Sequence, residues 1–282
     1  MEVKLAFSAD SDDIFMFWAL LNARIDTGMY DFVVERGDTQ VLNERAARGD
    51  IDVIAVSIAR YAAIANEYML LPHGASVGRG YGPALVAKGP RSLESLRGAR
   101  IGVPGLTTTA YWALRIVFPE FDPVVLPIVP FSRAFEAVAN DEVDAALLIH
   151  EGRLTFEDAG LHMVADLGVL WTDATGMPLP LGGNAIARQL GSKHIEAISK
   201  LCRASIVYAL THRGEVMAAL LSEEARADLS LSRERLDRYL AMYANEDTRA
   251  TAPDVKVAIA DLFTRARAAG LIENEVTLTF AP

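Results

Sequence analysis

One histidine stands where a proton could be exchanged with a bound molecule. In the stretch AALLIHEGRLTF, His150 directly follows an apolar run that is typical of a buried strand, and Glu151 comes next. An imidazole titrates near neutral pH, so it can take up a proton under physiological conditions. A structural histidine bonded to a nearby carbonyl is the alternative. Because His150 comes where the chain leaves the predicted sheet, we expect it at the edge of a cleft.

Three consecutive threonines open the helix predicted in GLTTTAYWAL. A strand ends at Val103, Pro104 and Gly105 turn the chain, and Thr107 and Thr108 then offer hydroxyl groups beside free backbone N–H groups. A helix start of this kind binds a carboxylate or phosphate well. One threonine is enough for an ordinary N-cap, which is the alternative. The repetition of threonine keeps both interpretations open.

A glycine-rich segment, VGRGYGPAL, surrounds Arg79 and Gly80. Glycine lets backbone approach a ligand closely, and an arginine can hold a carboxylate through two parallel hydrogen bonds. A plain turn with a solvated arginine is the alternative. The segment has neither the spacing of a dinucleotide fingerprint nor the Gly-Lys-Ser/Thr of a P-loop, so it does not indicate a nucleotide phosphate site.

Acidic residues mark the junction SADSDDIFMF, between an alternating apolar stretch and a helical pattern. Asp10, Asp12 and Asp13 suit a helix N-terminus, because carboxylates accept from free N–H groups and meet the positive end of the helix dipole. Ligands in open α/β sheets also sit just beyond the carboxyl ends of strands. We therefore expect these acids both to cap the helix and to face a cleft, with Asp13 contacting the ligand.

Strands and helices alternate over the first two-thirds of the chain, which favours parallel or mixed sheets covered by helices. The pattern restarts after KGPRSL and is helical from Lys193 onward. We predict an α/β protein of two lobes. Lobe 2 spans residues 91–182, and lobe 1 is discontinuous, spanning residues 1–90 and 183–282, with the helical tail packed back on it. Because domain interfaces often hold binding sites, the candidate residues should meet in the cleft between the lobes.

The composition narrows the classes of partner. A net charge of −10 without a Lys/Arg-rich run argues against nucleic acid and anionic membranes, although a local pocket can still hold a small anion. No apolar run is long enough to span a membrane and the N-terminus lacks a signal-peptide pattern, so we expect a cytoplasmic protein. The single cysteine, Cys202, should be a buried core residue, and no Cys/His cluster has the spacing of a zinc site.

Four longer stretches, taken in this order, resemble one family. They are GRGYGPALVAKGP, VPGLTTTAYWAL, DAALLIHEGRLTFEDAGL and DLGVLWTDATGMPLPLGGNAIAR. Together they look like the menaquinone-biosynthesis proteins of the futalosine route, in the 1,4-dihydroxy-6-naphthoate synthase branch, over nearly the whole chain. The resemblance implies a two-lobed fold of the periplasmic-binding-protein type (type II). It also implies a lyase reaction on cyclic de-hypoxanthinyl futalosine that requires no metal or other cofactor.

The resemblance also assigns roles to residues. It implies that His150 is the general base, and that the following residues line the pocket for a carboxylate-bearing substrate: Ser8, Asp13, Asn43, Ser57, Arg79, Gly80, Thr107 and Thr108. The family usually has Ser-Pro-Cys-Pro-Asn-Asp-Thr-Phe where this chain reads SADSDDIF, and a lysine just before Ser57 where this chain is apolar. A non-catalytic binding or sensor protein for a small carboxylate and a chorismate-type dehydratase stay open as alternatives, as does a homodimer.

Overall fold

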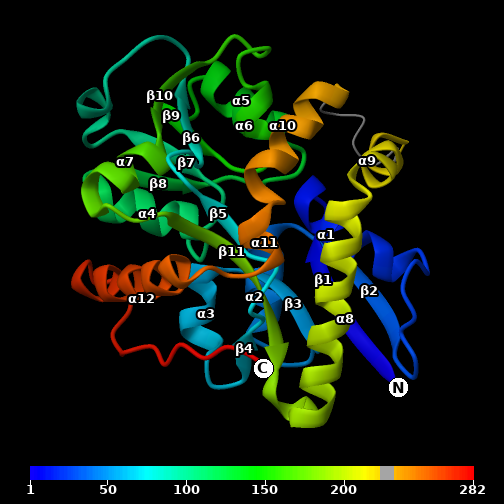
Figure 1. Cartoon of the computed structure of the whole chain (residues 1–282). Helices are drawn as coiled ribbons and strands as arrows, with labels where there is room; N and C mark the ends of the chain where they lie inside the picture. The colour runs from blue at the N-terminus through cyan, green and yellow to red at the C-terminus, as the bar shows by residue number, and fades with distance from the viewer. Residues whose placement is uncertain (223–231) are drawn as a thin grey trace.

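The strands form two separate sheets, and the first sheet contains both the first and the last strand of the sequence. The computed structural model describes residues 1–222 and 232–282 (Figure 1). The first sheet has the order β2-β1-β3-β11-β4, with β5 paired to β11. Its strands are β1 (Glu2–Ser8), β2 (Asp31–Gly37), β3 (Val53–Ser57), β4 (Tyr68–Leu70), β5 (Ser76–Gly78) and β11 (Leu179–Ala187). Because β1 runs parallel to β2 and β3, their carboxyl ends meet at one edge of the sheet.

The second sheet has the order β10-β6-β9-β7-β8. Its strands are β6 (Ala84–Ala87), β7 (Arg100–Val103), β8 (Asp122–Val125), β9 (Ala145–Leu148) and β10 (His162–Asp166). Strand β7 runs parallel to β8 and β9, whereas β6 is antiparallel to β9 and β10. Residues 84–87 were expected in lobe 1, but as β6 they pair in the second sheet. The chain crosses from the first sheet to the second between β5 and β6, before the KGPRSL segment at which the sequence pattern restarts.

Helices cover both sheets, and the tail touches both halves. The long helix α8 packs along α1, and α12 lies beside both α3 and α4 (Figure 1). The helices are α1 (Ser11–Leu21), α2 (Thr39–Ala46), α3 (Ile58–Ile64), α4 (Thr109–Val117), α5 (Ser132–Ala139), α6 (Gly152–Thr155), α7 (Leu167–Thr175), α8 (Ser192–Thr211), α9 (Arg213–Ser222), α10 (Arg233–Tyr243), α11 (Glu246–Arg249) and α12 (Pro253–Ala268), with short 3-10 helices at Leu93–Leu96 and Arg188–Leu190. The tail therefore does more than cover lobe 1.

The tail is not helical to its end, contrary to the expectation from sequence. Helix α12 ends at Ala268, and Phe280 then forms a β-bridge with Leu70 of β4. The backbone N–H of Leu70 donates to the carbonyl of Thr279 at 3.0 Å. The alternating pattern VTLTF explains this extended segment, because β-branched and aromatic residues favour strands. Residues 223–231 of the predicted tail lie outside the described residues.

The apolar core joins the two sheets. One cluster combines Ile54 of β3, Ile101 of β7 and Trp171 of α7, and Trp171 is fully buried. A second cluster lies between α1 and the tail and contains Phe15 and Cys202, so the cysteine is buried as predicted. Among the helices of the described ranges, none has both the length and the apolar character that crossing a membrane requires.

Candidate active site

A cavity of about 100 Å³ is lined from both sheets. Ser8 and Ser57 reach it from the carboxyl ends of β1 and β3, and His150 reaches it from just after β9. Strand ends supply these residues because side chains become accessible where the chain leaves a sheet. Further lining residues are Asp10, Asp12, Asp13, Thr39, Thr108, Thr109, Arg153, Tyr239 and Tyr243.

The start of α1 brings three carboxyl groups to this cavity. Asp10 occupies the N-cap position, but its side chain makes no capping hydrogen bond and instead pairs with Nδ1 of His150. Asp13 accepts a hydrogen bond at 2.8 Å from the backbone N–H of Ser8. The acids therefore line the cavity, whereas the expectation that Asp10 caps the helix through its side chain is wrong. The imidazole competes for that carboxylate.

Asp12 is held by two hydroxyl groups from distant elements. Its carboxylate accepts from Ser76 and from Tyr239 of α10, each at 2.8 Å. Burial, and after it the charge of Asp10, raises the pKa of Asp12 to about 7. The same two causes raise the pKa of Asp13 well above its ordinary value. Neighbouring buried carboxyl groups do not all ionise together. At neutral pH the cavity therefore carries less negative charge than the three acids in the sequence suggest.

His150 adopts a backbone conformation that residues other than glycine rarely adopt. Its φ is 53°, in the left-handed region, and such residues cluster at functional sites. Nδ1 pairs with Asp10, and Nε2 lies 2.9 Å from the hydroxyl oxygen of Thr39. Burial alone would lower the pKa of the imidazole, but the charge and hydrogen bond of Asp10 outweigh it and raise the pKa to about 10. In this arrangement His150 is protonated at neutral pH.

The next residue, Glu151, binds the same helix. It is buried, and its carboxylate accepts from the backbone N–H of Ser11 at 2.8 Å and also from the Ser11 hydroxyl. Ser11 is the first residue of α1, where free N–H groups and the helix dipole favour a negative charge. His150 and Glu151 thus attach the loop after β9, in the second sheet, to the helix that follows β1 in the first.

The threonines at the start of α4 divide between capping and lining. Thr108 is the N-cap, and its hydroxyl oxygen accepts from the backbone N–H of Tyr111 at 3.3 Å. Thr108 and Thr109 both line the cavity. Thr107 lies outside the lining, and its hydroxyl donates to Gln40 at 2.8 Å. The two interpretations of this stretch are therefore compatible, because the capping residue itself faces the cavity.

Asn43 supports Ser57 and does not line the cavity itself. It is fully buried in α2, and its side-chain amide donates to the Ser57 hydroxyl at 3.0 Å. Its carbonyl oxygen accepts from the backbone N–H of Ser57 at 2.9 Å. Two hydrogen bonds fix the orientation of the Ser57 peptide and leave that residue as the one that reaches the cavity.

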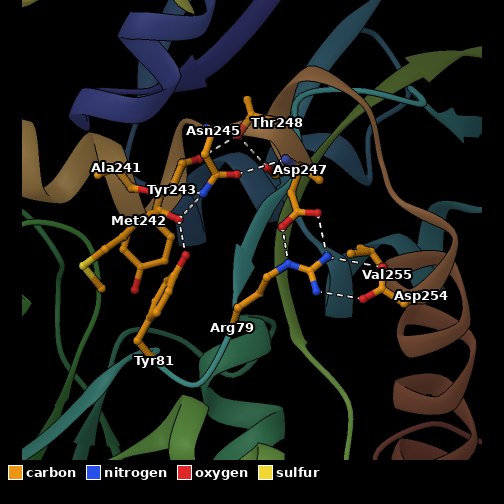
Figure 2. Close-up of polar contacts among 11 residues, drawn as sticks. Arg79, Tyr81, Ala241, Met242, Tyr243, Asn245, Asp247, Thr248, Asp254 and Val255 are labelled. Carbon is orange, nitrogen blue, oxygen red and sulfur yellow. Dashed lines mark hydrogen bonds and ion pairs between the residues drawn. The ribbon is translucent and has the colours of Figure 1, made fainter.

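Arg79 lies outside the lining and is tied to the tail (Figure 2). Its guanidinium forms two parallel hydrogen bonds with Asp247, at 2.6 and 2.8 Å, and two more with Asp254, at 2.7 and 3.2 Å. Gly80, with φ of 72°, lies outside the lining as well. The structure therefore does not bring these two residues together with the other predicted site residues. Protein carboxylates occupy the donors that were expected to hold a substrate.

The sequence did not indicate several polar lining residues: Thr39, Ser76, Arg153, Tyr239 and Tyr243. Arg153 pairs with Asp166 through Nη2, and its buried Nε has no hydrogen-bond partner among the described residues. Its place three residues after His150, in HEGR, was an available signal. The two tyrosines, four residues apart, share one face of α10. No local pattern indicates that this face reaches the cavity.

Asp10, Asp12 and His150 place potential metal-ligating atoms within 4.8 Å of one another. In this arrangement the Asp10 carboxylate bonds to the imidazole, and the Asp12 carboxylate accepts from two hydroxyl groups. These contacts use the atoms that a metal ion would need. We therefore describe the three residues as a hydrogen-bonded group.

The chain is similar to known proteins both in sequence and in fold. The sequence model of a family described as menaquinone biosynthesis matches residues 3–268. The 1,4-dihydroxy-6-naphtoate synthase of Thermus thermophilus is 37% identical over 270 residues, which cover 95% of each chain. The structure of protein AF1704 from Archaeoglobus fulgidus superposes with a TM-score of 0.88 at 39% identity, covering 96% of this chain and 98% of that one. The alkanesulfonate-binding protein of Xanthomonas axonopodis, at 15% identity and a TM-score of 0.73, covers 98% of this chain and 95% of its own. The fold is that of periplasmic binding proteins.

Proposed function

The chain belongs to the menaquinone biosynthesis family, and on that premise we propose that it is a lyase that forms 1,4-dihydroxy-6-naphthoate from cyclic de-hypoxanthinyl futalosine. The observation that supports this proposal best is His150, a partly buried imidazole that reaches a cavity between two sheets and is held there by a carboxylate. A relative that matches along nearly the whole chain is named for that product. We further propose that the reaction takes place in the cytoplasm.

The start of α4 and the end of β3 form the side of the cavity that suits the substrate carboxylate. Thr108 and Thr109 line the cavity at a helix N-terminus, where the dipole favours an anion, although their hydroxyl groups donate to the backbone carbonyls of Gly105 and Leu181. Ser57 adds a hydroxyl group whose position Asn43 fixes. Arg153 brings a positive charge to the same cavity. These groups favour an anion, whereas the carboxyl groups at the start of α1 repel one. The substrate carboxylate should therefore point toward α4 and away from α1.

His150 acts as the general base in this proposal. Cleavage of a bond next to a carbonyl begins when a base removes the proton on the neighbouring carbon, and the freed electron pair moves toward the carbonyl. Nε2 is the ring nitrogen that is not paired with Asp10, so it is the atom that takes up this proton. An imidazole whose pKa is raised to about 10 is a strong base with a small unprotonated population at neutral pH.

Two halves built around the two sheets enclose the reacting atoms. The cavity is lined by buried residues such as Ser8, Ser57 and Thr108, and a closed site excludes water from a reactive intermediate. We propose a small carboxylate-bearing molecule as the physiological partner. The acidic charge balance of the chain, −10, gives no reason to add nucleic acid.

The test is incubation of the purified protein with cyclic de-hypoxanthinyl futalosine, followed by mass spectrometry for the dihydroxynaphthoate. His150→Ala should lower turnover by about 100-fold or more, while substrate binding survives. His150→Asn is the matched control for folding, because asparagine tolerates the left-handed backbone; it should be as inactive as the alanine variant. Near-normal turnover in either variant would remove His150 from the mechanism. Tight binding without product in the wild type would indicate a non-catalytic binding protein.

The pH dependence of kcat/KM provides a second test. A general base with a pKa of about 10 gives a kcat/KM that rises roughly tenfold per pH unit from pH 7 and levels off near pH 10. If His150 acted as a general acid, kcat/KM would instead fall as pH rises through its pKa. A profile that is flat from pH 7 to pH 9 would contradict the proposed protonation of His150 in the free enzyme.

A further inference from the structure

The contact between Asp10 and His150 joins residues from two different sheets. Asp10 follows β1 of the first sheet, and His150 follows β9 of the second. The Asp10 carboxylate pairs with Nδ1 through one oxygen, and its other oxygen accepts from the Ser8 hydroxyl. Asp10 is 5% exposed, so water has little access to this contact. A buried, two-point attachment of this kind gives the carboxylate one orientation toward the ring.

We propose that Asp10 is the positioning residue for His150: by accepting the Nδ1 proton, it holds the ring so that Nε2 faces the cavity as the proton-accepting atom. This inference rests on the proposed function of His150 as a base. A histidine whose Nδ1–H is bonded to a carboxylate keeps one tautomer and one ring orientation. Thr39, whose hydroxyl lies 2.9 Å from Nε2, suits both states of the ring. Its O–H donates to the bare nitrogen, and its oxygen accepts once the nitrogen is protonated.

Other acids near His150 are engaged elsewhere. Of the described acids whose charges act on the imidazole besides Asp10, Asp12 accepts from two hydroxyl groups, Asp13 accepts from the backbone N–H of Ser8, and Glu151 accepts from Ser11. These carboxylates raise the affinity of the ring for a proton through space only, whereas Asp10 also makes the direct hydrogen bond. The charge effect is thus shared among the acids, but the orientation of the ring depends on Asp10.

The site is assembled from two halves of the molecule, which supply Asp10 and His150 separately. Because Asp10 and His150 come from different sheets, the ring is oriented only when the two halves stand as they do here. The left-handed backbone of His150 is costly by itself and persists because surrounding contacts hold it. Glu151, bound to Ser11, makes the second contact across the same boundary. The orientation of the base therefore depends on contacts between the two halves.

The experiment compares Asp10→Asn with Asp12→Asn. Both variants remove one carboxyl charge close to His150, but only the first removes the hydrogen bond to Nδ1. In Asp10→Asn, kcat should fall at least tenfold while KM changes less than threefold, because substrate contacts are kept. The rising limb of kcat/KM should move to lower pH by two units or more. Asp12→Asn should move that limb by less than one unit. Equal displacement in the two variants would overturn the positioning role and leave only a charge effect.

Histidine ring NMR tests the contact without substrate. In the wild type, the 15N shifts of His150 should show Nδ1 protonated at every pH up to about 10, with Nε2 as the titrating atom. The signal is assigned by its loss in His150→Asn. An unprotonated Nδ1 in the wild type would overturn the proposal. Because this readout needs no turnover, a protein that shows the ring state but makes no dihydroxynaphthoate would refute the lyase function and retain the positioning by Asp10.

Discussion

Replacing Asp12 with asparagine should remove a pH-dependent loss of stability from the fold. Asp12 is 5% exposed and accepts hydrogen bonds from Ser76 and Tyr239. Its pKa rises from 3.8 to about 7, mainly because burial disfavours the charged form and secondarily because Asp10 repels it. Ionisation of this group therefore opposes folding. Asparagine has nearly the same shape, and its carbonyl oxygen can accept one of the two hydroxyl protons.

The sign and size of the effect follow from proton linkage. A carboxyl group whose pKa is higher in the folded state than in the unfolded chain stabilises the fold fully below the unfolded value. That contribution is lost as pH rises through the folded value. A rise from 3.8 to about 7 corresponds to a total loss of about 4 kcal/mol, of which about 2.6 kcal/mol falls between pH 5 and pH 8. The wild type should lose this amount over that interval relative to Asp12→Asn.

The assay is urea unfolding of both proteins at pH 5 and pH 8, monitored by tryptophan fluorescence. The free energy of unfolding of Asp12→Asn minus that of the wild type should increase by about 2 to 3 kcal/mol from pH 5 to pH 8, because only the wild type is destabilised over that interval. Asp173→Asn, at an exposed position of α7, is the control and should show no such change beyond about 0.5 kcal/mol. A pH-independent difference for Asp12→Asn would refute the argument that a buried carboxyl group with a raised pKa occupies this position.

Four further changes test the packing of two glycines, the role of Arg79 and the burial of the cysteine. Gly168→Ala should destabilise the protein by about 3 kcal/mol in urea unfolding, because a Cβ there would lie 2.0 Å from the carbonyl oxygen of Tyr81. Gly214→Ala, with nothing within 4 Å, should instead stabilise α9 by about 0.5 to 1 kcal/mol. Arg79→Gln should lower stability by about 1 kcal/mol, a modest value since the side chain is 41% exposed, and should leave KM within about twofold; a tenfold rise in KM would return Arg79 to the substrate site. Cys202, whose pKa burial raises to about 12, should react with a thiol reagent only after unfolding, and rapid reaction in the native state would contradict its placement.

Some features of this protein follow from the order of neighbouring residues. Val3, Leu5 and Phe7 stand at alternate positions and are all fully buried in β1. Thr108 precedes a helical pattern and caps the helix that follows. Both depend on atoms a few residues apart, so propensity and period were enough to predict them. The resemblance that identified the family depends in the same way on short stretches of sequence, and the comparisons confirm it.

The tertiary structure alone decided which side chains meet. Arg79 finds Asp247, 168 positions away, and so leaves the cavity in which the glycine-rich segment was expected to place it. Asp10, a natural cap by local pattern, meets His150 because two sheets bring their strand ends together. The free energy of such contacts depends on the path of the whole chain and on burial. A short stretch of sequence contains neither, so SADSDDIF predicts three charged acids where the fold produces a buried, partly protonated group that orients a histidine.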